Sequence, residues 1–185
     1  MCFSFEISLL TGIFSWSVAF YLLKKPLTTV QRQKVIMLLL FSSMQFVDAI
    51  LWYIKMKKNN VNYVVTSLII PIILSLQIIY NIYVINNINN TYVTIIIFIS
   101  ILYLFVRFNG YSTSLCSNKL SSPIWASNEI KLWEIIIFSL LISTYPYIHY
   151  PLIPVLFIPL LFNGAYGSMW CAIANITAVY FLLTY

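Results

Sequence analysis

Long runs of apolar residues without regular alternation constrain this chain more than any other feature of its sequence. Two of these runs are Ile69 to Ile85 and Ile135 to Ile142. Only 8% of the 185 residues are charged, whereas a soluble domain carries roughly a quarter charged residues. Because the chain has too few charges to cover a water-exposed surface, we expect its surface to face lipid.

In lipid, a spanning segment has to satisfy its own backbone hydrogen bonds, which leaves α-helices and closed β-barrels. Barrel strands alternate apolar and polar residues with a period of two, and the apolar runs of this chain do not. The sequence therefore predicts an all-α fold, a polytopic transmembrane bundle of about seven helices, since each span needs about twenty residues. The whole chain, 1–185, forms a single transmembrane domain in this prediction.

Short connections separate the expected helices, apart from one polar loop at 109–130 that is rich in Ser and Asn. The predicted helices are 3–23, 35–54, 62–85, 92–108, 131–148, 150–163 and 167–185. The first is expected to be a retained helix, because Lys24 and Lys25 follow its apolar run, whereas a signal peptide has its basic residues in front. The sixth is short and rich in proline, so a complete crossing and a re-entrant hairpin both stay open.

Seven crossings would place the starts of the first, third, fifth and seventh helices on one membrane face, together with the ends of the second and fourth. All four acidic residues of the chain fall on that face. Orientation follows the Lys and Arg residues of short loops, in which the first helix usually dominates. Lys24, Lys25, Arg32 and Lys34 follow the first helix, which favours an N-terminus on the outside. The other six Lys and Arg residues fall on the opposite face, and their larger number favours the reverse orientation. Both orientations stay open, and of the two we favour the N-terminus outside.

Polar residues within the predicted helices gather towards this same face. Gln45, Asp48 and Trp52 are spaced i, i+3, i+7 and therefore share one stripe of the second helix. An ionisable residue inside a membrane helix costs roughly 3 kcal/mol or more and faces the bundle interior, which makes Asp48 the central candidate. The predicted cavity for a small solute or ion is lined by Glu6, Gln45, Asp48, Trp52, Gln77, Asn81, Arg107 and Asn175.

The same side chains also have a purely structural interpretation. Interhelical hydrogen bonds of Gln and Asn are worth about 0.6 kcal/mol each and hold helices together without any further role. Glu6 and Glu134 lie near helix ends, where we expect them to be solvated. An ion pair of Asp48 with a basic residue fits a structural role as well as a functional one. The candidate partners of Asp48 are Arg107, Lys55, Gln77 and Asn175.

Cys2, Cys116 and Cys171 fall on the face that collects the acids, so a thiol cluster or a Cys116–Cys171 disulfide is a hypothesis. Neither a Cys-x-x-Cys pair nor a Cys/His cluster occurs, and we predict no metal site. A Ser-His-Asp set and a Gly-rich phosphate loop are both missing. We therefore expect no catalytic residues and no cofactor, and an enzyme is the less favoured class. The charge of +6 is spread along the chain, which disfavours nucleic-acid binding.

Three short motifs stand out, near both ends of the chain and in the second predicted helix. The chain opens with Met-Cys-Phe-Ser at 1–4, followed by Glu6. Met44-Gln45 precedes Asp48 near the end of the second predicted helix, and Trp170-Cys171 opens the seventh. These motifs resemble those of an uncharacterised family of small polytopic membrane proteins from large DNA viruses, protists and bacteria.

Gln77 falls where members of that family have Gln-Pro in the third helix, but Ile78 follows it here. The resemblance implies no activity. It implies that one site contains Cys2, Glu6, Gln45, Asp48, Trp170 and Cys171.

Three functions fit the sequence. The leading hypothesis is a small-solute or ion transporter, or a channel-like protein, with Asp48 as the ionisable group of a polar cavity. The alternative is a non-catalytic membrane scaffold or viral membrane component. A second alternative is an intramembrane redox or metal protein that uses Cys2 and Cys171. The expected partners are the lipid bilayer, a small solute or ion, and a second copy of the chain.

Overall fold

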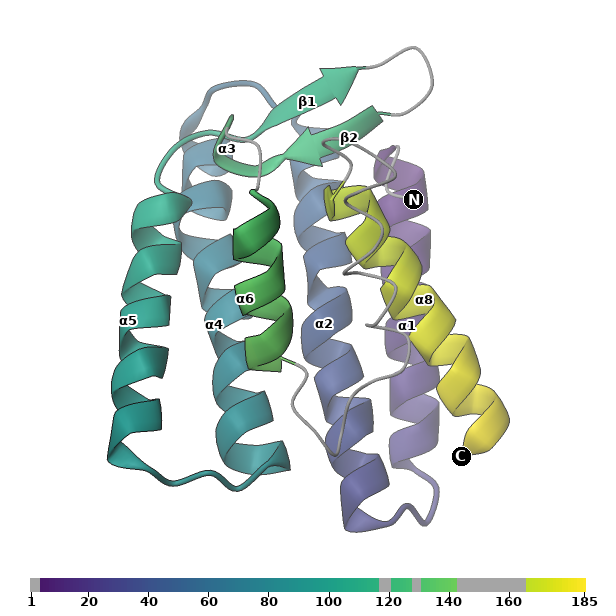
Figure 1. Cartoon of the computed structure of the whole chain (residues 1–185). Coiled ribbons are helices and arrows are strands. Elements are labelled where there is room, and N and C mark those ends of the chain that lie inside the picture. Colours follow the sequence, from purple (N-terminus) through teal and green to yellow (C-terminus); the bar gives the residue numbers. More distant parts are fainter. Residues whose placement is uncertain (1–3, 117–120, 128–130, 143–165) are drawn as a thin grey trace.

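The computed structural model describes residues 4–116, 121–127, 131–142 and 166–185. They form a bundle of helices with a two-stranded antiparallel hairpin across one end (Figure 1). We call this the hairpin end and the opposite one the far end. Apart from the hairpin and its connections, the described part of the chain is helical, which agrees with the all-α prediction.

Two π-helical segments, η1 and η2, flank α4, so that Asn60–Ile85 runs as one long helix. The helices are α1 (Phe5–Leu23), α2 (Thr29–Tyr53), α3 (Asn60–Val64), η1 (Val65–Ile69), α4 (Ile70–Ile79), η2 (Tyr80–Ile85), α5 (Thr91–Arg107), α6 (Leu132–Ile142) and α8 (Tyr166–Thr184). The strands are β1 (Thr113–Cys116) and β2 (Ser121–Ile124), and the short 3-10 turn η3 (Trp125–Ser127) follows β2.

The helices alternate in direction along the chain. The helices that start at the hairpin end are α1, the long helix Asn60–Ile85, α6 and α8 (Figure 1). α2 and α5 run back towards this end, and the two termini lie at opposite ends (Figure 1). The predicted sixth helix, 150–163, and the last part of the predicted fifth, 143–148, lie outside the described residues. The bundle of seven crossings therefore stays a prediction.

α2 begins at Thr29, well before the predicted start at residue 35. The reason is a capping box. The hydroxyl of Thr28 accepts the backbone N–H of Gln31 at 3.2 Å, and Oε1 of Gln31 accepts the N–H of Thr28 at 3.0 Å. This reciprocal pair satisfies backbone donors at the helix start. The first turn is polar, so a search for apolar residues alone places the start too late.

The η1 segment lies directly before Pro71. Proline lacks a backbone N–H, and its ring crowds the carbonyl group four residues earlier in an α-helix. A π-helical turn has i→i+5 hydrogen bonds in place of the i→i+4 pattern. The local widening of the helix at η1 therefore accommodates Pro71 within the long helix.

The predicted polar loop, 109–130, contains the hairpin. β1 and β2 pair so that Thr113 lies opposite Ile124 and Cys116 lies opposite Ser121. Each strand has four residues, and a segment so short and so rich in Ser and Thr carries no clear hydrophobic periodicity. The sequence pattern therefore missed the hairpin that lies across this end of the bundle (Figure 1).

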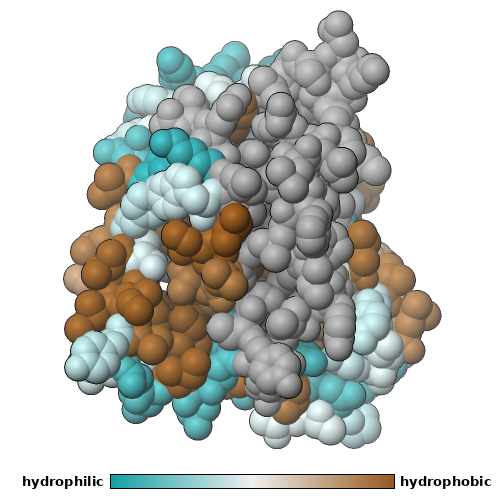
Figure 2. Space-filling model, in the orientation of Figure 1, coloured by the Kyte–Doolittle hydropathy of each residue, from teal (hydrophilic) through white to brown (hydrophobic). Residues whose placement is uncertain are grey.

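Three helices in the described part of the chain are long and apolar enough to cross a membrane: α1, α2 and Asn60–Ile85. Two shorter apolar helices are Thr91–Arg107, which is α5, and Ile173–Thr184 within α8. Hydrophobic surface covers α5 between more hydrophilic ends of the molecule (Figure 2). The exposed apolar side chains of α5 include Ile95, Ile96, Phe98, Ile99, Leu102 and Val106.

Small side chains allow α1 to lie close to α2. A Cβ atom at Gly12 would lie 3.1 Å from the ring of Phe46 and 3.3 Å from Cβ of Gln45. Such close approach of two helices is typical of small residues at membrane-helix interfaces. The small residues on the buried face of α1 are Ser8, Gly12, Ser15 and Ala19.

This contact predicts that Gly12→Leu separates α1 from α2, because the added side chain has to displace the ring of Phe46. We expect a loss of about 1–3 kcal/mol in the free energy of unfolding, measured by thermal or denaturant unfolding of the purified protein in detergent. Ser17→Leu places the same side chain on the exposed face of α1 and serves as the control. Equal stability of the two variants would contradict the proposed packing.

Candidate functional site

The carboxyl group of Asp48 is the polar feature around which the hairpin end is built. Asp48 lies near the end of α2 and is completely buried. The indole Nε1–H of Trp125 donates a hydrogen bond to its Oδ1 atom at 3.0 Å. Trp125 is itself only 4% exposed and follows β2 directly. The turn after β2 thus places a hydrogen-bond donor, Trp125, beside Asp48 of α2 in the bundle interior.

The stripe predicted on α2 lies in the bundle interior. Gln45 is completely buried like Asp48, and its Cβ faces the close contact with Gly12 of α1. Trp52 is half-buried and packs against the main hydrophobic core. The helical spacing therefore identified the direction of Asp48 correctly, but it offered no way to find Trp125 as its partner.

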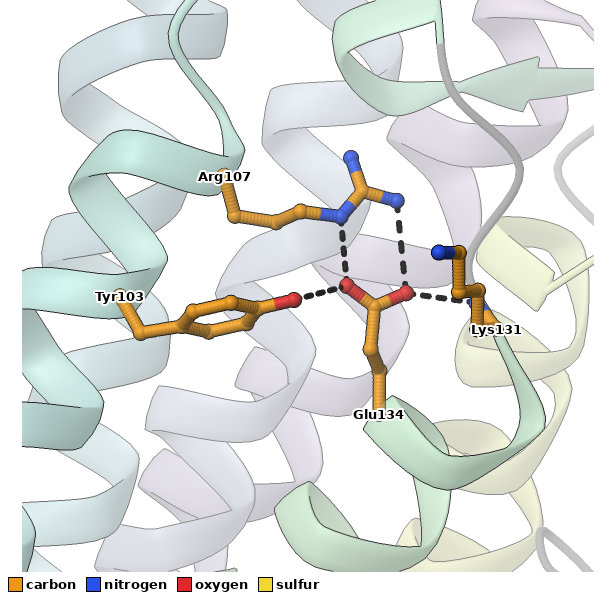
Figure 3. A network of polar contacts seen from close by, with 4 residues as sticks. All are labelled: Tyr103, Arg107, Lys131 and Glu134. Atoms are coloured by element: carbon orange, nitrogen blue, oxygen red, sulfur yellow. Dashed lines mark hydrogen bonds and ion pairs between the residues drawn. The ribbon is translucent and has the colours of Figure 1, made fainter.

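A second polar group connects α5 and α6 at the same end of the bundle (Figure 3). The Nε atom of Arg107 forms an ion pair with Oε1 of Glu134 at 2.5 Å, and the side chains are only 13% and 9% exposed. The hydroxyl of Tyr103 donates to Oε1 of Glu134 at 2.6 Å, and the backbone N–H of Lys131 donates to Oε2 at 2.6 Å. Glu134 is therefore a bonded group between two helices and not the solvated charge that its helix-end position suggests.

Two aromatic rings lie between this ion pair and Asp48. The guanidinium carbon of Arg107 is 5.7 Å from the ring centroid of Phe108, and the rings of Phe108 and Trp125 meet edge to face at 6.2 Å. Phe108 is almost completely buried. We call Asp48, Trp125, Phe108, Arg107 and Glu134 the hairpin-end site. The structure thus brings Arg107 to the neighbourhood of Asp48 but bonds it to Glu134.

The amides predicted on the third helix lie deeper in the bundle. Nε2 of Gln77 donates to the carbonyl oxygen of Leu40 in α2 at 3.1 Å, and Nδ2 of Asn81 donates to that of Leu141 in α6 at 2.7 Å. Leu40 precedes Asp48 by about 12 Å along the α2 axis at 1.5 Å per residue. Gln77 and Asn81 therefore form a separate group that bonds helices together, in agreement with the structural interpretation of these amides.

The other residues of the predicted site lie apart from Asp48 or outside the residues that the structure describes. Oδ1 of Asn175 in α8 accepts a hydrogen bond from the hydroxyl of Ser15 in α1 at 3.1 Å, which joins these two helices. Glu6 is exposed in the first turn of α1, where a carboxylate interacts favourably with the helix dipole.

Cys2 lies outside the described residues, while Cys116 ends β1 and Cys171 lies in α8. The thiol cluster therefore stays a prediction. In the ranges that the structure describes, no group of three or more His, Cys, Asp or Glu side chains is placed to hold a metal ion.

Sequence reasoning missed a buried polar cluster that anchors the hairpin, which we call the Asn62 cluster: Asn62, Thr66 and Ser112. All three residues are completely buried. Nδ2 of Asn62 donates to the carbonyl oxygen of Ser112 at 2.9 Å, and its Oδ1 accepts the N–H of Ser112 at 2.8 Å. The i, i+4 spacing of Asn62 and Thr66 was a usable signal, but Ser112 lies far away in sequence.

The ion pair predicts a specific result in a double-mutant cycle. Arg107→Leu and Glu134→Leu each leave one largely buried charge without its partner, so each should lower the free energy of unfolding by about 2 kcal/mol or more. The double variant should lose less than the sum of the two, since no unpaired charge is left. Unfolding in detergent measures all three variants.

Lys131→Gln is the matched control, because it removes an exposed charge and retains the backbone N–H that bonds Glu134. Its stability should equal that of the parent chain. Strictly additive losses for Arg107 and Glu134 would contradict a direct interaction between them.

No protein-family model, curated protein or solved structure matches this chain at a significant level.

Proposed function

We propose that the chain is a multi-pass integral membrane protein that moves a small solute or ion across the bilayer, with Asp48 as the ionisable group on its path. In this proposal the N-terminus and the hairpin end lie outside. The transported species enters at the hairpin end, where Asp48 lies beneath Trp125. The surrounding helices supply the apolar scaffold.

The membrane part of the proposal is supported by the length of three helices and by the apolar surface of α5. α1, α2 and Asn60–Ile85 are each long and apolar enough to span the hydrocarbon layer. The apolar side chains on the outer face of α5 include Phe98, which is 61% exposed, and Val106, which is 77% exposed. Such a surface is unfavourable in water and is accommodated by lipid.

The transport part depends on one observation, the complete burial of the Asp48 carboxyl group in the bundle. An acid within membrane helices costs free energy, and such acids commonly mark ion, proton or substrate pathways. The hydrogen bond from Trp125 compensates part of this cost. A protein that needs only mechanical support at this position would be as well served by an apolar side chain.

Asp48→Asn tests this proposal in proteoliposomes. Asn has nearly the same size, and its side-chain oxygen can still accept the Trp125 N–H, so the fold should be retained while the ionisable group is lost. We expect proton flux, reported by an enclosed pH-sensitive dye under an imposed potential, or ²²Na⁺ uptake, to fall to the level of empty liposomes. Lys58→Gln removes an exposed charge near the hairpin end and should leave the flux unchanged.

A second candidate function, a non-catalytic membrane scaffold, is favoured by the amide contacts. Gln77 and Asn81 bond to backbone carbonyls of neighbouring helices, and Asn175 bonds to Ser15. These contacts hold helices together and need no transported species. If the Asn variant and the parent chain show equal thermal stability and equal flux at the level of empty liposomes, the transport proposal is wrong and the scaffold is supported.

A further inference from the structure

Two contacts define the register of α1 against α2 near the hairpin end. The two helices pack against each other and run in opposite directions (Figure 1). At the hairpin end, the rings of Phe5 in α1 and Tyr53 in α2 meet with their centroids 5.5 Å apart. Deeper in the bundle, a Cβ atom at Gly12 would lie 3.3 Å from Cβ of Gln45. The residues between these two contacts therefore lie at the same levels on both helices.

Ser8 and Asp48 share one level of this interface. Ser8 precedes Gly12 by one helical turn, about 6 Å along the α1 axis, and Asp48 follows Gln45 by about 4.5 Å along α2. Because the helices are antiparallel, both steps lead towards the hairpin end. The two side chains are completely buried. The helices thus bring a hydroxyl group and a carboxyl group to nearly the same height in the bundle interior.

The hydroxyl of Ser8 has no hydrogen-bond partner among the residues that the structure describes. By contrast, Ser15 on the same buried face of α1 and Ser42 of α2 both donate to oxygen atoms of the protein. Burying a hydroxyl group without a partner costs free energy. Ser8 therefore supplies a buried oxygen that is available to a ligand at the level of Asp48.

Charge and spacing indicate the class of this ligand. Buried charges are paired or bind metal ions, and oxygen ligands of this kind suit hard cations. A monovalent cation balances the single negative charge of the Asp48 carboxylate, whereas a divalent one would leave a positive charge in the interior. Asp48 can retain the bond from Trp125, because a carboxylate has about four acceptor positions. Close packing of α1 on α2 at Gly12 favours Na⁺ over the larger K⁺.

From these observations we propose that Ser8 and Asp48 bind a sodium ion between α1 and α2, and we call this the sodium site. The hydroxyl oxygen and the carboxylate are its protein ligands. The sodium site specifies the ion that is transported, and in this respect it rests on the proposed function. Binding itself does not require transport, so binding and flux are measured separately.

Binding of ²²Na⁺ to the purified protein in detergent, measured by scintillation proximity, tests the sodium site. We expect saturable binding that is lost in Asp48→Asn, which removes the charge. Ser8→Ala should weaken the affinity by about tenfold or more, since changes around the ligands of a metal ion alone commonly cost this much. Ser15→Ala removes a buried hydroxyl from the same face of α1 and is the matched control, with unchanged affinity.

Thermal unfolding separates this site from a purely structural role of Ser8. In choline chloride, Ser8→Ala should be at least as stable as the parent chain, because the hydroxyl that it removes has no partner in the described part of the chain. In NaCl of the same ionic strength, at about ten times the dissociation constant, the midpoint of the parent chain should rise by about 3 °C or more. That of Ser8→Ala should not rise.

The sodium site is wrong if the parent chain binds no ²²Na⁺ saturably, or if Ser8→Ala and Ser15→Ala bind it with equal affinity. A loss of stability of Ser8→Ala in choline chloride, with no effect of NaCl on the parent chain, would assign Ser8 a structural role and also contradict the site.

Binding and flux together distinguish the sodium site from the transport proposal. If ²²Na⁺ binds through Ser8 and Asp48 while its uptake stays at the level of empty liposomes, the site is correct and the transport proposal is wrong. If proton flux depends on Asp48 while the parent chain binds no ²²Na⁺, the transport proposal stands with the proton as the ion, and the sodium site is wrong.

Discussion

Polar groups within an apolar bundle have to find their partners inside the protein, because neither lipid nor packed side chains can replace water. This constraint explains the internal arrangement of the chain. Gln77 and Asn81 use the backbone carbonyls of neighbouring helices, and Glu134 collects donors from α5 and from the start of α6. Asp48 accepts a hydrogen bond from Trp125, which lies in the turn after β2. The position of the hairpin is thus coupled to a buried acid of α2, a helix that precedes it by many residues.

Sequence alone revealed the parts of this arrangement that depend on local pattern. Hydrophobic runs located α1, the long helix Asn60–Ile85 and α5 to within a few residues, and the i, i+3, i+7 stripe placed Asp48 in the interior. α2 started earlier than predicted, because a capping box and not hydropathy decides its first turn. Partners that are distant in sequence could not be found in this way.

Trp125 and Ser112 illustrate this limit. Each lies in the segment that the sequence predicts to be a polar loop, and each meets its hydrogen-bond partner only after the chain has folded back over the bundle. Arg107 shows the same limit in reverse. Charge complementarity suggested Asp48 as its partner, but Glu134 lies on the adjacent helix α6 and also accepts from Tyr103 and Lys131. Among several possible ion pairs, packing and not sequence spacing decides which one forms.

The candidate residues fall into two levels of the bundle, and this separation shapes the functional account. Acidic, basic and aromatic side chains meet at the hairpin end, whereas the amides of Gln77 and Asn81 lie about two helical turns deeper and bond to backbone. The deeper amides hold the helices together, and the hairpin-end site contains the buried acid and the tryptophan that donates a hydrogen bond to it.

The bond between Trp125 and Asp48 is the central claim, and the indole N–H resonance of Trp125 reports it directly. In ¹⁵N-labelled protein in lipid nanodiscs, this resonance is assigned by its loss in Trp125→Phe. We expect it to persist for much longer in D₂O than that of the exposed Trp133, and to shift in Asp48→Asn. Rapid exchange of the Trp125 indole, together with no response to the change at residue 48, would contradict the hydrogen bond between Trp125 and Asp48.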